Sequence, residues 1–283
     1  MCGRFALGLQ RPEIRALPGY PQLNIEAWIG EDNFVPRYNI APNTQVPVIR
    51  RRDAGHESGP LVMHTMRWGI KYGKDGGSKA PQAINARSEN LVEGAGMWNK
   101  FRGKNRCIVV CQGYYEWQTK GKDKLPHFTR HSSDRVMLLA GLYECTAEKD
   151  SSEPMYTFAI VTTDASKALS WLHDRQPVII SAMNDIMRWL DTSSHSWSSE
   201  LASLLHPWKD TEEPLQCYQV PKEIGKVGAE SPTFIEPVAQ RKDGIQAMFA
   251  KQRSKQKATG KRKRDSLPCP DTSTTEDKRV KTE

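Results

Sequence analysis

Six short runs rich in β-branched and aromatic residues recur between residues 46 and 220, and they constrain the fold more than any other feature of the chain. Such residues suit the pleated, half-buried surface of a strand. The runs are Val46–Arg50, Leu61–Gly69, Cys107–Gln112, Val136–Tyr143, Met155–Thr162 and Cys217–Val220. Four helix-like stretches accompany them: Pro12–Leu17, Ser166–Leu172, Asn184–Leu190 and Ser198–Leu205. This order predicts one α+β domain over residues 1–240, mainly antiparallel β, as a sheet or barrel with short flanking helices.

Polar stretches mark where elements are expected to begin and end. Arg51–Pro60 holds two glycines and Lys71–Pro81 is rich in glycine and lysine, so both are predicted to be loops. The second loop fits either the border of a binding site or a simple connector. Asp164 or Ser166 is expected to cap the second helix, and Asn184 the third.

Beyond residue 240 the chain changes character, and residues 241–283 are predicted to be a disordered tail. The tail holds one basic run: Lys261, Arg262, Lys263 and Arg264. This run resembles a nuclear localisation signal, so we expect a nuclear protein, with a solvated charge run as the alternative. Gly244–Phe249 places three apolar side chains on one helical turn. It fits either a peptide that docks on the replication sliding clamp or the last packed turn of the domain.

The positive charge of the chain is concentrated in that tail. The net charge is +8, from 41 Lys and Arg against 33 Asp and Glu. Of these, 13 basic and 6 acidic residues lie beyond residue 240, which leaves 28 and 27 on residues 1–240. A nucleic-acid site on the domain therefore has to be a local patch, because the domain as a whole is nearly neutral.

Cysteine usage and hydropathy exclude several classes of protein. The six cysteines form no CxxC pair, so we expect no zinc site. No apolar run approaches the ~18 residues of a membrane helix, and the N-terminus lacks the segments of a secretory signal. We expect a soluble intracellular monomer without a metal, a cofactor or a membrane partner.

Cys2 gains a distinctive chemistry once Met1 is removed, as methionine aminopeptidases do before a small second residue. The new α-amine has a reference pKa of about 7.7–8.0 and the thiol about 8.5, so both are partly nucleophilic at neutral pH. A 1,2-aminothiol condenses with an aldehyde: the amine forms an imine, and the thiol then closes a five-membered thiazolidine. An internal cysteine cannot do this because its nitrogen is an amide. The Met-Cys dipeptide alone nevertheless favours an accidental start, so the other motifs decide.

Three further motifs are each weak alone: Ala83–Glu89, Gly113–Trp117 and Leu172–Pro177. Singly they fit a helix cap, a half-exposed glutamate and a structural histidine. Together with the N-terminus they resemble the SOS-response-associated peptidase (SRAP) family, whose members act on abasic sites in single-stranded DNA. The matching segments, in order, are Met1–Phe5, Arg37–Pro42, Arg67–Gly69, Ile84–Glu89, Gly113–Trp117 and His173–Pro177.

The resemblance implies a barrel-like core, a positively charged groove and a covalent crosslink between Cys2 and the abasic sugar. It implies that Asn85 orients the N-terminal residue and the sugar, that Glu116 acts as acid or base, and that His173 transfers protons. The expected DNA contacts are Arg4, Asn39, Pro42, Arg67, Trp68, Arg87 and Arg175. For Arg4, Arg87 and Arg175 the resemblance implies one of two roles, to hold phosphates or to order the site. Arginines suit phosphates and aromatic rings suit bases, whereas the neighbouring Tyr114 and Tyr115 are expected in the core.

The chemistry of an abasic sugar agrees with these roles. The sugar is mostly a closed hemiacetal, so an acid or base must help to open it to the aldehyde. Loss of water from the carbinolamine then needs a proton donor, which Glu116 supplies if burial raises its pKa, or His173 does. An imine at this sugar risks strand cleavage by β-elimination. Thiol attack by Cys2 removes that risk.

The chain departs from the family pattern at three places. Trp68-Gly69-Ile70 runs on without the proline and second tryptophan that members often carry, so a stacking wedge is missing unless Tyr72 substitutes. Gly94–Trp98 lacks a basic residue found in members, and Val220–Gly225 differs from their V-S-x-x-V-N. These segments do not include the expected crosslinking and proton-transfer residues. We expect altered DNA affinity or junction preference with the chemistry retained.

Two rival functions stay open. In the first, Cys2 is the thiol nucleophile of a peptidase or autopeptidase, with its own amine or His173 as base. In the second, the protein reads modified or single-stranded DNA without a covalent bond, tolerates Cys2→Ala and loses binding as salt rises.

Overall fold

The computed structural model describes residues 2–54, 57–72, 81–147, 153–209 and 213–240. The chain divides into a compact unit, Met1–Val238, and a second unit, Ala239–Glu283, of which only the first two residues are described. The predicted tail, its basic run Lys261–Arg264 and most of the Lys71–Pro81 loop therefore lie outside the described residues.

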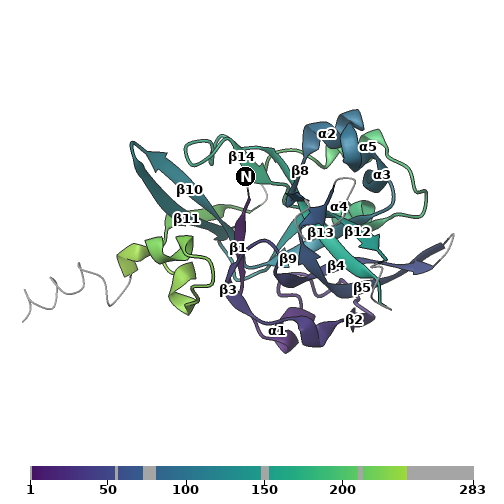
Figure 1. Cartoon of the computed structure of the whole chain (residues 1–283), viewed down its shortest axis with the longest axis horizontal. Helices are drawn as coiled ribbons and strands as arrows, with labels where there is room; N and C mark the ends of the chain where they lie inside the picture. Colours follow the sequence, from purple (N-terminus) through teal and green to yellow (C-terminus); the bar gives the residue numbers. More distant parts are fainter. Residues whose placement is uncertain (1, 55–56, 73–80, 148–152, 210–212, 241–283) are drawn as a thin grey trace, which may run out of the picture. The chain divides into compact units, whose positions relative to one another are not determined.

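Strands outnumber helices in the described part of the chain (Figure 1). The strands are β1 (Arg4–Leu7), β2 (Ala27–Ile29), β3 (Arg37–Ile40), β4 (Gln45–Ala54), β5 (Glu57–Trp68), β6 (Ile70–Lys71), β7 (Gln82–Ala83), β8 (Asn85–Arg87), β9 (Arg106–Cys111), β10 (Gly113–Lys120), β11 (Asp123–His131), β12 (Met137–Thr146), β13 (Met155–Asp164), β14 (Arg175–Pro177) and β15 (Leu215–Gln219). The helices are α1 (Arg11–Arg15), α2 (Ser88–Glu93), α3 (Asn99–Arg102), α4 (Met183–Leu190) and α5 (Ser199–Ser203), with 3-10 turns η1 (Glu31–Asn33), η2 (Gly96–Trp98), η3 (Lys222–Gly225), η4 (Pro232–Ile235) and η5 (Val238–Gln240). The α+β class, mainly antiparallel, is confirmed.

One sheet closes on itself. Its strands run in the order β14-β13-β12-β9-β4-β5-β2, and β5 also pairs in parallel with β13. This extra pairing, through Thr157↔Arg67 and Phe158↔Trp68, joins the two ends of the series β13-β12-β9-β4-β5. The expected barrel-like core is therefore present. Closure removes two open strand edges, which would otherwise expose unpaired backbone groups.

A second sheet, in the order β15-β11-β10-β1-β3, holds the N-terminal strand. β1 lies between β10 and β3 and pairs antiparallel with both, so the first residues of the chain are fixed on two sides. β8, from the Ala83–Glu89 motif, instead pairs in parallel with β13 of the barrel. The two sheets therefore bring the N-terminal segment and the Ala83–Glu89 motif toward one place.

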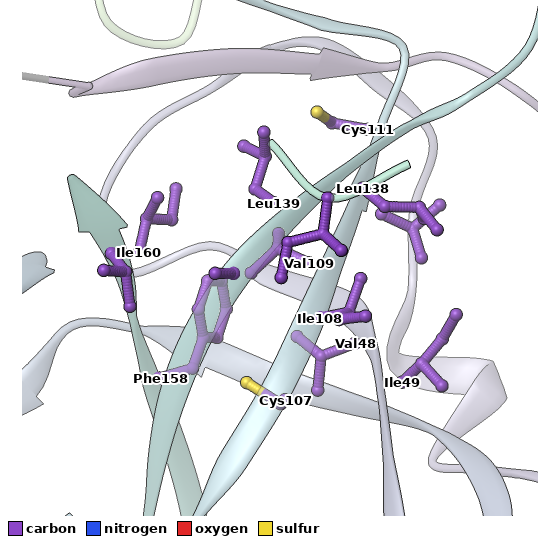
Figure 2. Packing of buried hydrophobic residues seen from close by; sticks show 14 of the residues in the cluster. Val48, Ile49, Cys107, Ile108, Val109, Cys111, Leu138, Leu139, Phe158 and Ile160 are labelled. Carbon is purple, nitrogen blue, oxygen red and sulfur yellow. The ribbon is translucent and has the colours of Figure 1, made fainter. Parts of the chain in front are cut away.

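The core fills the barrel with residues from strands that the sequence pattern identified (Figure 2). Val48, Ile108, Val109, Leu139 and Phe158 have no exposed surface. A smaller cluster lies on the other side of β10 and β11, where Tyr115 and Phe128 pack with Val220, Ile224 and Phe234. As expected, Tyr114 and Tyr115 are both buried.

The existence of the strands was predicted more accurately than the strand boundaries or the helices. Each of the six predicted runs overlaps a strand, and the helices predicted from Pro12, Asn184 and Ser198 correspond to α1, α4 and α5. Ser198 caps α5 by accepting a hydrogen bond from the Leu201 N–H, whereas α4 begins after Ala182 and has no side-chain cap, so the Asn184 cap was wrong.

Two predictions of local structure were wrong. Arg51–Pro60 is largely an extension of the β4–β5 hairpin, because cross-strand pairing continues to Ala54↔Glu57. Ser166–Leu172 forms consecutive turns in place of a helix. The flanking residues Asp164 and Arg175 are strand partners, so the loop must return its ends to within one strand spacing, about 5 Å.

No helix of the described chain is long and apolar enough to cross a membrane.

Trp68 joins the two sheets, so its loss should destabilise the fold. The ring is fully buried, lies 5.0 Å from the ring of Phe5 in β1 and 6.4 Å from Phe158 in the barrel, and donates from Nε1 to the Ile84 carbonyl oxygen. We expect Trp68→Ala to lower the free energy of unfolding in urea by about 3–5 kcal/mol. Trp171→Ala removes an exposed tryptophan and is the matched control, with a change of about 1 kcal/mol or less. Equal effects would contradict the structural role of Trp68.

Candidate functional site

The N-terminal residue is held where the two sheets meet. Cys2 lies two residues before the start of β1 and is only 1% exposed. The Asn85 side chain donates from Nδ2 to the Cys2 carbonyl oxygen at 2.9 Å. Asn85 itself is fixed because β8 pairs with β13 at Asn85↔Ile160. Its Oδ1 is buried and makes no hydrogen bond with the described residues, so an acceptor remains beside Cys2.

Glu116 and His173 form a pair next to this residue. Glu116 lies on β10, the neighbour of β1, and is 5% exposed. His173 Nε2 lies 3.9 Å from Glu116 Oε1. Burial raises the pKa of the Glu116 carboxyl, and His173 acts in the opposite direction. A carboxyl with a raised pKa serves as a proton donor closer to neutral pH.

The Cys2 thiol shares this buried surrounding. Burial raises the pKa of the Cys2 thiol well above its ordinary value, and the neighbouring Glu116 carboxylate raises it further. The Sγ atom lies 4.0 Å from the Arg4 carbonyl oxygen, its acceptor in the resting state. The sulfur is therefore a protonated thiol at neutral pH, and it needs a base before it attacks.

His173 has a partner on Nδ1 for each of its charge states. The Arg175 backbone N–H donates to Nδ1 at 2.9 Å, which suits a neutral ring with its proton on Nε2. Asp174 Oδ1 lies 2.6 Å from the same nitrogen, which suits a protonated ring. One hydrogen-bond donor and one acceptor therefore face the same ring nitrogen.

Arg175 is held by its neighbours. Its guanidinium binds Glu89 in a two-pronged ion pair, meets Asp164 at 2.8 Å and donates to the Thr162 carbonyl oxygen at 2.8 Å. These bonds fix the backbone N–H that reaches His173. Of the two roles expected for Arg175, these contacts favour the ordering of the site over the binding of a phosphate.

Other expected DNA contacts also hold the fold. Arg4 donates to Asn39 Oδ1 at 2.7 Å and to the Ile224 carbonyl oxygen at 3.0 Å. Asn39 is buried and donates to the carbonyl oxygens of Lys226 and Ala229. These bonds tie β1 and β3 to the segment around η3. Asn39 therefore has a structural position, and Arg4 is half-buried beside it.

Trp68 has no surface that a base could reach. Its ring lies in the core between β1 and the barrel, as described above. This placement replaces the expected base-stacking role of Trp68 with a structural one, because a fully buried ring cannot contact DNA in this conformation.

The remaining expected contacts are accessible. Arg67 is exposed at the end of β5, Arg87 is exposed at the end of β8, and Pro42 is half-buried after β3. Both arginines lie on strands that pair with β13, opposite Thr157 and Thr162. Their contacts with DNA stay predictions.

Sequence reasoning did not single out two aromatic residues beside the site. His127 is the register partner of Glu116 across β10 and β11, and the exposed Trp171 lies against it. The only available signal was a tryptophan within a polar loop, two residues before His173.

Within the described residues, no group of three or more His, Cys, Asp or Glu side chains could hold a metal ion.

Comparisons with known proteins agree on one family. The family described as SOS response associated peptidase (SRAP) matches residues 1–227. The Saccharomyces cerevisiae abasic site processing protein YMR114C is 35% identical over 235 residues, which cover 81% of this chain and 60% of that protein. The chain thus spans less than two thirds of the yeast relative.

Two further comparisons cover nearly whole proteins. The Bacillus subtilis abasic site processing protein YoqW is 31% identical over 239 residues, covering 83% of this chain and 99% of that one. A crystal structure of a Bacteroides thetaiotaomicron protein has a TM-score of 0.67 at 22% identity and covers 83% of this chain and 99% of that one. At this identity the crystal structure shows the fold alone.

The raised pKa of Glu116 predicts a pH-dependent cost to stability. Above the ordinary pKa of 4.5, the unfolded chain releases a proton that the folded protein still holds. Stability contributed by this group is therefore lost as pH rises from about 4.5 toward the folded pKa. We expect the free energy of unfolding in urea of Glu116→Gln to rise relative to that of the wild-type protein as the pH increases across this range.

Glu93→Gln, at an exposed glutamate on α2, controls for the loss of a negative charge. If the free energies of unfolding of the wild-type protein and of Glu116→Gln change with pH in parallel, the raised pKa of Glu116 is contradicted.

Proposed function

The chain belongs to the SOS response associated peptidase (SRAP) family, and on that premise we propose that it captures abasic sites in single-stranded DNA through the amine and thiol of Cys2. One observation carries the proposal: Asn85 holds residue 2 by its carbonyl oxygen, while the Glu116–His173 pair lies beside it. The substrate class comes from relatives in yeast and Bacillus subtilis that are named abasic site processing proteins.

The reaction begins once Met1 has been removed and the Cys2 nitrogen is an amine. The abasic sugar opens from its hemiacetal to the aldehyde with proton transfer by Glu116 or His173. The amine attacks the aldehyde carbon to give a carbinolamine, which loses water to give an imine. The raised pKa of the buried thiol favours this order, because the sulfur stays protonated while the amine reacts.

Ring closure follows by addition of the thiol across the imine. The sulfur bonds to the former aldehyde carbon, the thiol proton leaves through the Glu116–His173 pair, and the imine nitrogen gains a proton. No oxidant or reductant is needed. The thiazolidine carbon no longer makes the neighbouring C–H acidic, so the strand is protected from β-elimination. The same groups run the steps in reverse when the crosslink is released.

The fixed side chains supply positioning. Asn85 Nδ2 holds the Cys2 carbonyl group, and the open acceptor on Asn85 Oδ1 suits the new amine or a sugar hydroxyl. Asp174 and the Arg175 N–H support both charge states of His173. Arg67 and Arg87 are the accessible cations proposed for phosphates.

A nuclear location is part of the proposal, resting on Lys261–Arg264. Deletion of residues 241–283 tests this location by imaging, and an unchanged amount of the protein in the nucleus would contradict it. Clamp binding through Gly244–Phe249 is tested by the same deletion in a pull-down.

Covalent capture predicts a crosslink that needs both the lesion and Cys2. We expect purified protein, with Met1 shown to be absent by mass spectrometry, to shift a single-stranded oligonucleotide with one abasic site on a denaturing gel. Cys2→Ala and Cys2→Ser both keep the amine but lose the thiol, so each should give no stable band unless borohydride reduces the imine.

The controls separate the rival functions. An undamaged strand should give no band. If the wild-type protein gives no shifted band but still binds the strand in a salt-sensitive way, the protein is a non-covalent reader instead. Turnover of peptide without DNA would establish a peptidase.

Asn85 is expected to accelerate the crosslink by holding residue 2. Asn85→Ala removes one hydrogen bond, worth about 1 kcal/mol, so the crosslinking rate at saturating DNA should fall about fivefold. Asn99→Ala, at an exposed asparagine that begins α3, is the control and should leave the rate unchanged. Equal rates for the two variants would remove Asn85 from the proposed site.

A further inference from the structure

The loop between β13 and β14 is a fixed structure that carries His173. Its ends are joined by a hydrogen bond from the Ala165 N–H to the Asp174 carbonyl oxygen at 2.9 Å. Inside the loop, the N–H groups of Leu169 and Ser170 donate to the Ser166 carbonyl oxygen at 3.0 and 2.9 Å. Leu169 and the residue before His173, Leu172, are buried. The loop therefore presents its remaining side chains in set positions.

Trp171 projects from this loop and is 48% exposed, more than any other tryptophan of the described residues. Its indole Nε1 already donates to the Ala168 carbonyl oxygen at 2.8 Å. That bond fixes the ring and uses its single hydrogen-bonding group. What the side chain still offers to a partner is a flat apolar surface, which favours stacking over hydrogen bonding.

The ring lies beside the reacting groups. Trp171 meets His127 edge-to-face, with ring centroids 5.1 Å apart and planes at 82°. His127 is the register partner of Glu116, and directly opposed residues of an antiparallel pair project from the same face. The indole is therefore on the face of the β10–β11 hairpin from which Glu116 projects.

His127 makes a firm and neutral support for the indole. Its Nδ1 lies 2.9 Å from the Leu125 carbonyl oxygen, which orients the imidazole. Burial lowers the pKa of His127 from 6.5, so the ring is uncharged at neutral pH.

We propose that Trp171 is a base-stacking subsite, which receives the nucleobase next to the abasic nucleotide when single-stranded DNA occupies the site. An abasic nucleotide has no base of its own, so its flanking bases are the aromatic groups nearest to the reacting sugar. Stacking on a tryptophan tolerates any base, because every base has a π-face. The inference rests on the proposed function, since it takes the abasic sugar to lie at Cys2.

Non-covalent binding tests the stacking contact separately from the chemistry. The probe is a single-stranded oligonucleotide with one tetrahydrofuran abasic analogue, which has no aldehyde and cannot crosslink. Three further probes lack the base on the 5′ side, on the 3′ side or on both sides of the analogue. The full chain is compared with Trp171→Ala, Trp171→Phe and the control Val92→Ala, which shortens an exposed apolar residue on α2.

We expect Trp171→Ala to raise the Kd for the probe with both flanking bases about tenfold. Trp171→Phe should give a smaller rise, and Val92→Ala none. The effect of Trp171→Ala should vanish on the probe that lacks the stacked base, which also identifies its side. An unchanged Kd, or a rise that is the same on all four probes, would overturn the proposal.

The crosslinking rate at saturating abasic DNA distinguishes stacking from support of the His173 loop. Trp171→Ala should keep the wild-type rate within about twofold, because Glu116 and His173 remain in place. A large fall of this rate on every substrate would show that Trp171 props the loop and would overturn the stacking role. Failure of the wild-type protein to crosslink would refute the proposed function, while the analogue probes would still read the stacking contact.

Discussion

The hydrogen bond from Asn85 to the Cys2 carbonyl group joins the two sheets at the site, and the proposed chemistry depends on it. Chain ends usually fray, yet a reaction at residue 2 needs that residue in one place. β1 fixes the end from one side, since it lies between β10 and β3. Asn85, carried by β8 on the barrel, fixes it from the other. The barrel and the flanking sheet together convert a terminus into a positioned group.

Burial gives this site its electrostatic character and also costs stability. The same exclusion of water raises the pKa of both the Glu116 carboxyl and the Cys2 thiol. A protonated thiol is inert until a substrate and a base arrive, which limits side reactions of the cysteine. His173 lies at the partly exposed edge of the pair, with Asp174 and the Arg175 N–H on its other nitrogen. The arrangement links the buried groups to solvent through one histidine.

Some of the residues that the sequence motifs predict to contact DNA hold the site together instead. Arg4 binds Asn39 and the Ile224 carbonyl group, and Arg175 binds Glu89 and Asp164. Such bonds keep β1 and the His173 loop in place, which is a sufficient reason for arginine at both positions. Trp171 shows the reverse, because no motif contains it, yet its exposed ring borders the site.

The sequence by itself determined the strands and the chemistry available to residue 2, because both depend on local properties. Runs rich in β-branched and aromatic residues sufficed to find strands such as β4 and β13, and the position of Cys2 makes an aminothiol available once Met1 is removed. Only the tertiary structure decided which aromatic ring is buried and which is exposed. Trp68 lies in the core because β5 pairs with β13, and Trp171 is presented by a loop whose ends are strand partners. Burial and closure arise from pairings between distant segments, which local sequence patterns do not specify.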